Sequence, residues 1–383
     1  MATATVAEAT RGTAPLDPPF RADQVGSLLR PADLLEARAQ WKAGTLPLDE
    51  LRSMEDRAIR QVVVEQEATG LRVVTDGEFR RESYFADFFE RGLGGFKRHA
   101  DAGKGWNYQD AQGKQRGASL TTITAPMRWT KPIHADEFEF LASVTKVTPK
   151  ITLPSPSIPH FFGGRENISR DVYPDLDMMW ADLVDSYRRE LKALYDVGCR
   201  YVQIDETAMA KFGDPKIRQA LADRGDSWED LLPLYAGVIN DCLAEAPADM
   251  HIALHSCRGN NQGSWQAEGG YDPVADTLFN KVNAHSYFLE YDSPRAGDFS
   301  PLAHAPADKM IVLGLVTTKS GRMESRDDLL KRIGQAAVHL PLDQLCLSPQ
   351  CGFASAAPGN PISFAEQDAK LRLVVDVAGE VWG

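Results

Sequence analysis

Two cysteines and a histidine give the sequence its clearest chemical signal. His255 and Cys257 stand two residues apart, directly after the apolar run 252–254, and Cys351 follows far downstream. Since side chains of a β-strand alternate between its faces, an H-x-C pair at a strand end presents both side chains on one face. Thiolates beside an imidazole form a ligand set that suits Zn²⁺. A buried cysteine beside a core histidine explains the same short pattern, because free cysteine is among the most buried residue types.

A rhythm of short apolar runs and amphipathic stretches predicts the elements that position these residues. The apolar runs lie at 71–75, 201–204, 252–254, 287–289, 310–316 and 345–348. Helical periodicity fills much of the chain between them, most clearly at 178–196. Strands that alternate with helices indicate parallel βαβ units. We therefore expect an α/β fold, a (β/α)₈ TIM barrel whose chemistry lies at the C-terminal ends of the strands.

The 383 residues are consistent with one such barrel, because barrels with insertions reach roughly 400 residues. Residues 1–18 are small, polar and proline-containing, so we expect a flexible N-terminal arm before a barrel at 19–383. The glycine-rich segment from Gly92 to Gly117, with a strand candidate at 119–124, predicts an inserted hairpin-like excursion that serves as a lid or as a contact in a homo-oligomer. A doubly wound sheet is the alternative architecture, but no G-x-G-x-x-G motif follows a strand.

Composition narrows the classes of partner and compartment. The balance of 42 basic against 54 acidic residues gives a net charge of −12, which argues against nucleic acid or an anionic membrane as a partner. No run of 18 apolar residues is present, so we expect no membrane span. Five cysteines without an export-signal pattern predict reduced thiols and a cytoplasmic protein.

Glu290 ends the run 287–289 and extends the cysteine–histidine signal. In a barrel, His255, Cys257, Glu290 and Cys351 come from three separate βα corners and face one mouth. Such a set predicts a metal site with an exchangeable ligand, which is typical of catalytic zinc. A metal there would hold an incoming thiol as thiolate, the nucleophilic form.

A second set of polar residues follows other strands of the predicted barrel. Ser27, Glu78 and Asp205 all stand at strand ends, and two carboxylates facing the mouth suit an ammonium group. We expect Asp76 and Glu206, by contrast, to cap the helices that follow them.

Several basic and amide residues near the mouth have more than one interpretation. Arg258, Asn260 and Asn261 bind an anionic end of the substrate or shape the loop after Cys257. Lys319 follows the run 310–316 and is an acid, an anion contact or a solvated side chain.

Together these residues resemble the catalytic barrel of the cobalamin-independent methionine synthase family, and most closely its short, single-barrel members. The resemblance rests on the segments 25–27, 76–79, 203–206, 255–257, 288–290 and 349–352. It implies that zinc is bound by His255, Cys257, Glu290 and Cys351. It also implies that the amino-acid part of homocysteine is held by Ser27, Glu78 and Asp205, with Asp205 serving in catalysis as well. The homocysteine sulfur would then attack a methyl group, which in full-length members comes from a 5-methyl folate.

This chain departs from the full-length pattern around the methyl donor. Lys319 takes the position of a strand-end histidine and becomes a catalytic candidate, while Thr317 replaces the acid before it. The segment 152–157 replaces the stretch leading to a tryptophan that stacks on the pterin, and Phe161 or Phe162 would take that role. We therefore expect a zinc-dependent methyltransferase acting on homocysteine, with a methyl folate or another methyl carrier as donor.

Three other functions remain as alternatives. Epoxyalkane:coenzyme M transferases resemble this family and open an epoxide with a zinc-bound thiol that bears a sulfonate. Lys319 and Arg258 favour that alternative, whereas Ser27, Glu78 and Asp205 favour an amino-acid thiol. A non-catalytic zinc-binding scaffold predicts a metal spectrum that ignores added thiols, and a zinc-free hydrolase or lyase predicts well under one zinc per chain.

Overall fold

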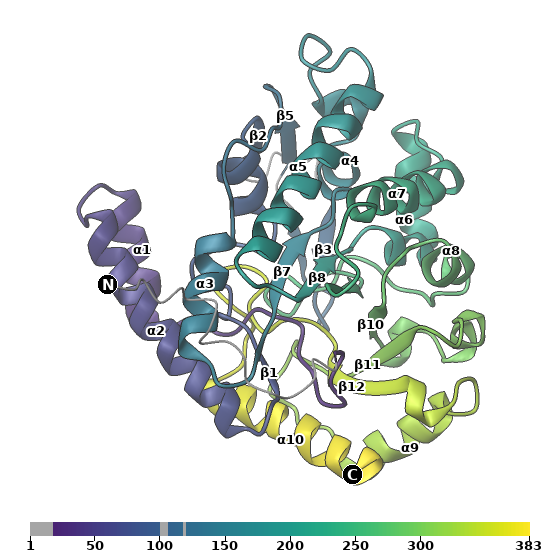
Figure 1. Cartoon of the computed structure of the whole chain (residues 1–383). Helices are drawn as coiled ribbons and strands as arrows, with labels where there is room; N and C mark the ends of the chain where they lie inside the picture. Colours follow the sequence, from purple (N-terminus) through teal and green to yellow (C-terminus); the bar gives the residue numbers. More distant parts are fainter. Residues whose placement is uncertain (1–17, 100–105, 118–119) are drawn as a thin grey trace.

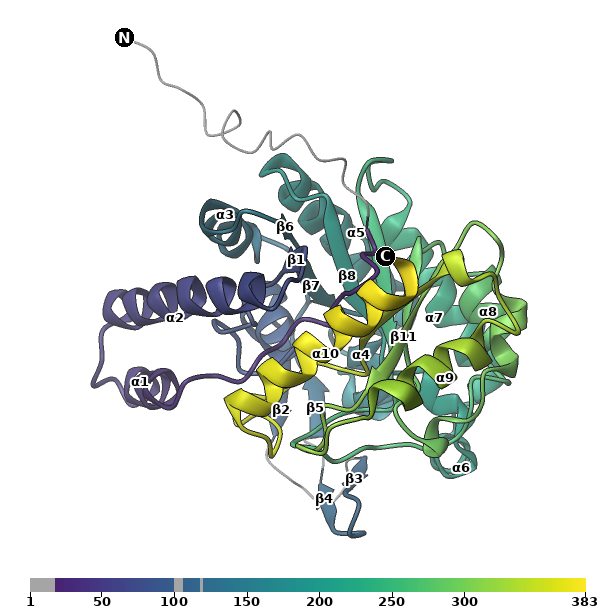
Figure 2. The ribbon, with the colours of Figure 1, turned by 90° about the horizontal axis from the view of Figure 1, so that it is seen from below.

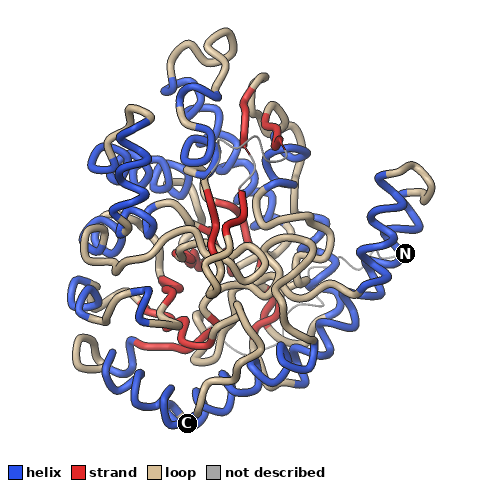
Figure 3. The backbone as a smooth tube through the Cα atoms, turned by 180° about the vertical axis from the view of Figure 1, so that it is seen from behind, coloured by secondary structure: helices blue, strands red, loops and turns tan. Residues whose placement is uncertain are grey.

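Parallel strands form the centre of the molecule, and helices surround them (Figures 1 and 3). The computed structural model describes residues 18–99, 106–117 and 120–383. Six strands pair in parallel in the order β12-β11-β10-β9-β8-β7. They are β7 (Ile151–Pro154), β8 (Tyr201–Asp205), β9 (His251–Ser256), β10 (Ser286–Glu290), β11 (Met310–Val316) and β12 (Leu345–Pro349).

Short segments near the N-terminus close this sheet into a ring. β1 (Val73–Val74) pairs in parallel with β6 (Thr148–Pro149), which lies one residue before β7. Ala22 forms a parallel bridge to Leu347 of β12, and the Leu28 N–H donates to the Gly77 carbonyl at 3.1 Å. The segment around Ala22 therefore lies between β12 and the chain after β1, which confirms the predicted (β/α)₈ barrel.

The helices follow the strands in the order that the sequence pattern predicts. They are α1 (Ala32–Lys42), α2 (Leu48–Ala68), α3 (Ala135–Val144), α4 (Ile158–Gly163), α5 (Leu176–Asp196), α6 (Pro215–Asp223), α7 (Trp228–Leu243), α8 (Ala275–Asn280), α9 (Arg326–Ala336) and α10 (Phe364–Trp382). The amphipathic stretch 178–196 is α5, and Ser325 caps α9 by accepting from the Asp328 N–H. In the part of the chain that the structure describes, no helix has the length and apolar character needed to cross a bilayer.

A buried ion pair fills the interior of the barrel below the mouth. Lys150 and Asp23 are both fully buried, and Lys150 Nζ lies 2.8 Å from Asp23 Oδ1. Tyr201 donates its hydroxyl to Asp23 at 2.8 Å, and Gln203 Oε1 lies 3.2 Å from Lys150 Nζ. The pair therefore joins the segment around Ala22 to β8 and to the chain between β6 and β7.

The two ends of the described barrel meet on one side of the molecule. The Arg21 guanidinium lies 5.6 Å from the ring centroid of Trp382, at the end of α10, and donates to the Leu345 carbonyl. Figure 2 shows the described segment before α1 running beside α10, while α1 and α2 extend away from the barrel. The expected arm at 1–18 lies outside the described residues except for Pro18.

The predicted excursion forms two antiparallel strand pairs outside the barrel. β2 (Phe96–His99) pairs with β5 (Leu120–Ile123), and β3 (Asn107–Gln109) pairs with β4 (Gln115–Gly117). Gln109 and Trp265 exchange two backbone hydrogen bonds of 2.8 and 2.9 Å. The β3–β4 hairpin is thereby attached to the loop that follows β9.

Candidate active site

His255, Cys257 and Cys351 meet at the C-terminal mouth of the barrel. One ligand atom from each residue lies within 4.8 Å of the other two, and all three residues are buried. Cys257 Sγ lies 3.9 Å from Cys351 Sγ. Neither ring nitrogen of His255 has an oxygen or nitrogen partner among the described residues. A buried imidazole that bonds to the Cys257 sulfur rather than to oxygen or nitrogen, beside a second cysteine sulfur, fits a thiophilic metal such as Zn²⁺.

Electrostatics favour the charged form of one sulfur. The hydrogen bond from Cys351 holds the pKa of the Cys257 thiol well below its usual range; burial opposes this shift and His255 adds to it. Burial acts to lower the pKa of His255, but the charge of Cys257 reverses that effect and the pKa is raised. Thiolate is the form of cysteine that binds metals, so Cys257 is prepared for ligation.

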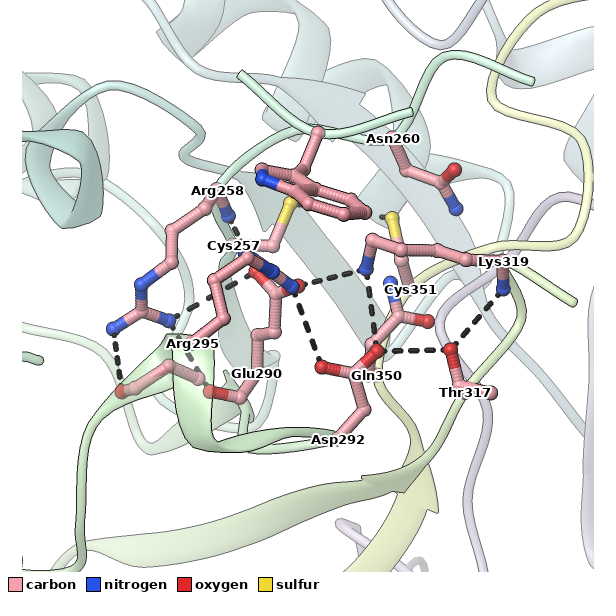
Figure 4. A network of polar contacts seen from close by, with 12 residues as sticks. Cys257, Arg258, Asn260, Glu290, Asp292, Arg295, Thr317, Lys319, Gln350 and Cys351 are labelled. Carbon is pink, nitrogen blue, oxygen red and sulfur yellow. Dashed lines mark hydrogen bonds and ion pairs between the residues drawn. The ribbon is translucent and has the colours of Figure 1, made fainter. Parts of the chain in front are cut away.

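Glu290 lies beside these residues but is engaged in ion pairs (Figure 4). Its carboxylate accepts from the Arg258 backbone N–H at 2.6 Å, from Arg295 at 2.5 Å and from Lys319 at 2.7 Å. Burial opposes ionisation, but Lys319, Arg295 and Arg258 together hold the pKa of Glu290 well below its usual range. The carboxylate is thus ionised and oriented near the sulfur pair, while its role as a metal ligand stays a prediction.

Lys319 is a partner of carboxylates. Its ammonium also lies 3.4 Å from Asp292, which accepts a 2.8 Å hydrogen bond from Thr317. Burial acts to lower the pKa of Lys319, but Asp292 and Glu290 outweigh it and the pKa is raised. The structure shows ion pairs of Lys319 with two side chains of the protein, and its roles toward a substrate, as an acid or as an anion contact, stay predictions.

The three predicted substrate residues line the same small cavity as the sulfur pair. Ser27, Glu78 and Asp205 face it together with Cys257 and Cys351. The volume of this cavity is about 30 Å³. Metal-binding and ammonium-binding candidates from distant parts of the chain therefore converge at one point.

Glu78 is held in a strained backbone conformation. Its φ is +59°, in the left-handed region that non-glycine residues rarely adopt. Asp76 Oδ1 accepts the Glu78 N–H at 2.8 Å and so fixes this turn, rather than capping a helix as we expected. Thr152 donates to Glu78 Oε1 at 2.7 Å, whereas the buried Oε2 has no hydrogen-bond partner among the described residues. Strain of this kind persists where the surroundings fix it, and it is common at binding sites.

Asp205 and Ser27 complete the ammonium-binding side of the cavity. Gln203 donates to Asp205 Oδ1 at 2.8 Å, and burial raises the pKa of Asp205 to about 7. A cation placed beside it would restore its charge at neutral pH. Ser27 comes so close to Gly352 that a Cβ on that glycine would overlap the serine hydroxyl. The glycine in the Cys351-Gly352 pair thus leaves room for the serine.

The hairpin contributes a residue that the sequence pattern does not reveal. Tyr108 of β3 lines the cavity, and a Cβ on Gly259 would lie 3.1 Å from its ring. Gly259 has a φ of +89°, which glycine adopts without strain. Tyr84, Thr207 and Ser355 also line the cavity and were not predicted. Their positions depend on loop conformations, for which single polar residues in the sequence give no signal.

The remaining predicted residues shape loops or pack inside the protein. Arg258 donates to the carbonyls of Gly269, Glu290 and Ala296, so it shapes its loop. Asn260 lines the cavity and donates to Gly352, whereas Asn261 forms a backbone bridge to Ser264.

The predicted capping residue Glu206 and the two candidate stacking rings are also in place. Glu206 accepts from the backbone N–H groups of Ala208 and Met209 at the start of a 3₁₀ turn, as a cap does. Phe161 stacks on Trp106 with the planes 4° apart, and Phe162 stacks on Phe85. One face of each ring is therefore occupied within the protein.

A family model described as "Cobalamin-independent synthase, Catalytic domain" matches residues 20–380. The chain belongs to this family. The fold and the order of the strand-end residues are those that the resemblance in the sequence implies.

Members of the cobalamin-independent synthase family with known sequences or structures cover nearly the whole chain. A Bacillus subtilis protein, described as uncharacterized protein YxjH, is 42% identical over 366 residues, which are 95% of each chain. A Listeria monocytogenes structure, described as a candidate vitamin-B12-independent methionine synthase, is 34% identical with a TM-score of 0.74 and covers 95% of this chain and 98% of its own. A Shewanella structure of a B12-independent methionine synthase in complex with selenomethionine is 20% identical with a TM-score of 0.68, over 94% of this chain and 96% of its own, and supports the fold.

Proposed function

We propose that the protein is a zinc-dependent methyltransferase that transfers a methyl group to the sulfur of homocysteine and forms methionine. The observation that carries this proposal is the shared cavity, in which a His/Cys/Cys cluster faces Ser27, Glu78 and Asp205. A thiol and an ammonium group a few bonds apart, as in homocysteine, match these two sides. Family membership supports methyl transfer, and relatives described as methionine synthases from Pyrococcus are 24% identical over 86% of this chain and 84% of their own length.

His255, Cys257 and Cys351 would hold the zinc, with Glu290 as the exchangeable fourth ligand. Zinc bound there would supply Lewis acidity that keeps the substrate sulfur deprotonated near neutral pH. Glu290 is the candidate for exchange because Lys319 and Arg295 already neutralise its carboxylate. These two cations would stabilise the Glu290 carboxylate if it were not bound to the metal.

The substrate amino acid is held by other residues that line the same cavity. The free Oε2 of Glu78 accepts from the ammonium group, and Asp205 becomes charged when this cation arrives. Ser27 supplies a hydroxyl at the same end. Tyr108 and Tyr84 exclude bulk water, so a thiolate formed in the cavity is weakly hydrated and reactive.

The basic residues argue against a sulfonate-bearing thiol as the substrate. Arg258 is bound to loop carbonyls, and Lys319 is bound to Glu290 and Asp292. Among the described residues that line the cavity there is no lysine or arginine. A sulfonate in this cavity would therefore face two carboxylates, and this favours an amino-acid thiol over a sulfonate-bearing one.

The methyl donor is a methyl folate or a related methyl carrier. A Bacillus velezensis protein named as a 5-methyltetrahydropteroyltriglutamate–homocysteine methyltransferase is 22% identical over 92% of this chain, which spans only 42% of that relative.

X-ray absorption at the zinc edge, with and without homocysteine, tests the proposal on anaerobically purified protein. We expect the zinc to gain one sulfur neighbour with homocysteine and none with coenzyme M. The proposed function is excluded if the zinc coordination shell does not change with either thiol. It is also excluded if the protein binds well under one zinc per chain. The reverse preference would instead assign the protein to the epoxide-opening class.

A further inference from the structure

A buried lysine without a partner lies next to the site. Lys211 belongs to a 3₁₀ turn, Met209–Gly213, that follows β8 and the pair Asp205-Glu206. Its side chain is fully buried, and its ammonium has no hydrogen-bond partner among the residues that the structure describes. Burying an ammonium without a carboxylate or carbonyl is costly, so natural chains rarely keep one without a function.

Aromatic rings surround this ammonium on one side. Lys211 Nζ lies 4.9 Å from the ring centroid of Phe161 and 5.1 Å from that of Phe162. The electron-rich faces of the two rings attract the cation but offer it no acceptor. These contacts hold the ammonium in place but leave its N–H groups without a hydrogen-bond acceptor among the described residues.

Negative groups of the site also act on this ammonium. The strongest attraction on Lys211 comes from Cys257, followed by Glu206, Glu290 and Cys351. Glu206 is already saturated, because it accepts from Ser155 and Ser157 and from the two backbone N–H groups of the turn. Lys211 therefore interacts electrostatically with the sulfur pair. None of the described protein groups accepts a hydrogen bond from its ammonium.

Lys211 and Lys319 have opposite surroundings. Lys319 is locked between Glu290 and Asp292, which raise its pKa and make it a poor proton donor. Burial lowers the pKa of Lys211 to about 8, with Cys257, Glu206, Glu290 and Cys351 opposing that shift. A group of this kind is protonated at neutral pH and gives its proton up readily, as general acids do.

Methyl transfer from nitrogen to sulfur requires a proton donor. The thiolate sulfur forms a bond to the methyl carbon while the carbon–nitrogen bond breaks and its electron pair stays on nitrogen. An amide anion is a very poor leaving group, so a proton must reach that nitrogen. On the basis of the proposed function, we infer that Lys211 donates this proton to the leaving nitrogen of a neutral N-methyl amine donor of the methyl-folate class.

The atoms, charges and electrons of this step balance with the three reactants named here. Thiolate, N-methyl amine and the Lys211 ammonium become thioether, secondary amine and a neutral Lys211 amine. Solvent protonates Lys211 again when the products leave. No oxidant or reductant is consumed.

The variant Lys211→Met tests this role, with Lys216→Met as the control. Methionine keeps the length and the aromatic contacts of the lysine but carries no proton, and Lys216 is an exposed lysine on the adjacent α6. With 5-methyltetrahydrofolate and homocysteine, we expect Lys211→Met to lose about 100-fold or more in kcat, the range of a lost general acid. The control keeps the wild-type rate.

The pH profile of kcat and a second methyl donor distinguish a catalytic role of Lys211 from a structural one. The wild-type kcat with 5-methyltetrahydrofolate falls as pH rises, because Lys211 loses its proton, and this limb is absent from the variant. Trimethylsulfonium releases neutral dimethyl sulfide and needs no proton, so the variant keeps its rate with this donor. The variant's Tm does not fall, since an unpaired buried charge has been removed.

Different failures have different meanings. A small loss with the folate, or a wild-type profile that Lys211→Met leaves unchanged, overturns the role of Lys211. A lower Tm with equal losses for both donors shows a structural lysine and overturns it as well. A wild-type enzyme that uses the sulfonium but not the folate overturns the donor class. If the wild type methylates homocysteine with neither donor, the proposed function itself fails.

Discussion

At the scale of single residues, the clearest sign of function is the strained Glu78 with one free carboxylate oxygen. We expect Glu78→Gln to weaken homocysteine binding by roughly 10- to 100-fold, because a hydrogen bond to a charged group contributes about 1.5–3 kcal/mol. Isothermal titration measures the affinity, and the exposed Glu139→Gln on α3 is the control. Unchanged binding in Glu78→Gln would remove the main support for an amino-acid substrate.

The pKa of Asp205 gives the site a testable pH dependence. Burial raises this pKa to about 7, so the residue loses its charge as pH falls below 7. We expect the affinity for methionine to fall by roughly tenfold per pH unit below 7, because ammonium binding requires the carboxylate. Methionine has no thiol, so deprotonation of sulfur does not contribute. Titrations between pH 5.5 and 8 would contradict this assignment if Asp205→Asn showed the same slope as the wild type.

The strand-end residues were predictable because type and position coincide. A histidine, a cysteine and carboxylates after apolar runs face the mouth of any barrel, so Ser27, Glu78 and Asp205 could be grouped from the sequence. The state of each side chain could not be predicted. Glu290 is ion-paired because Arg295 and Lys319 reach it from other loops, and Lys211 is unpaired because Glu206 has other partners. These ion pairs and their absence depend on packing between segments that lie far apart in the sequence, and no sequence pattern links those segments.

At the scale of elements, the β3–β4 hairpin places Tyr108 in the wall of the cavity that also contains the sulfur pair. We expect Tyr108→Ala to speed the alkylation of Cys257 and Cys351 by iodoacetamide in metal-free protein, by on the order of tenfold, because local opening governs access to buried groups. Gln112→Ala, at the exposed tip of the same hairpin, is the matched control. Peptide mass spectrometry follows each thiol. Equal rates in all three proteins would mean that the hairpin does not limit access.

The elements differ in how far the sequence predicts them. α5 follows from its helical periodicity, and the excursion follows from its break in the rhythm. The attachment of β3 does not follow, because Gln109 and Trp265 meet through backbone hydrogen bonds between segments far apart in the chain. The first two barrel segments are also hard to predict, since β1 spans only two residues and the segment at Ala22 makes a single bridge.

At the scale of the whole molecule, the ion pair inside the barrel joins the segment around Ala22 to the chain between β6 and β7. We expect Asp23→Asn to lower the free energy of unfolding by about 3–5 kcal/mol, because it leaves the Lys150 ammonium buried without its charged partner. Asp196→Asn, which removes an exposed pair with Lys192, is expected to cost at most about 1 kcal/mol. Urea denaturation compares them, and similar losses would show that the interior pair contributes little.

The contact between Arg21 and Trp382 has a consequence for the connectivity of the chain. Because the first and last barrel segments touch, a short linker joining them would leave every strand and helix in place. New ends could then be opened at the exposed turn around Gly44, between α1 and α2, whose residues do not line the cavity. A circular permutant of this kind keeps the cavity intact, and it frees the neighbourhood of Arg21 and Trp382 from carrying chain ends.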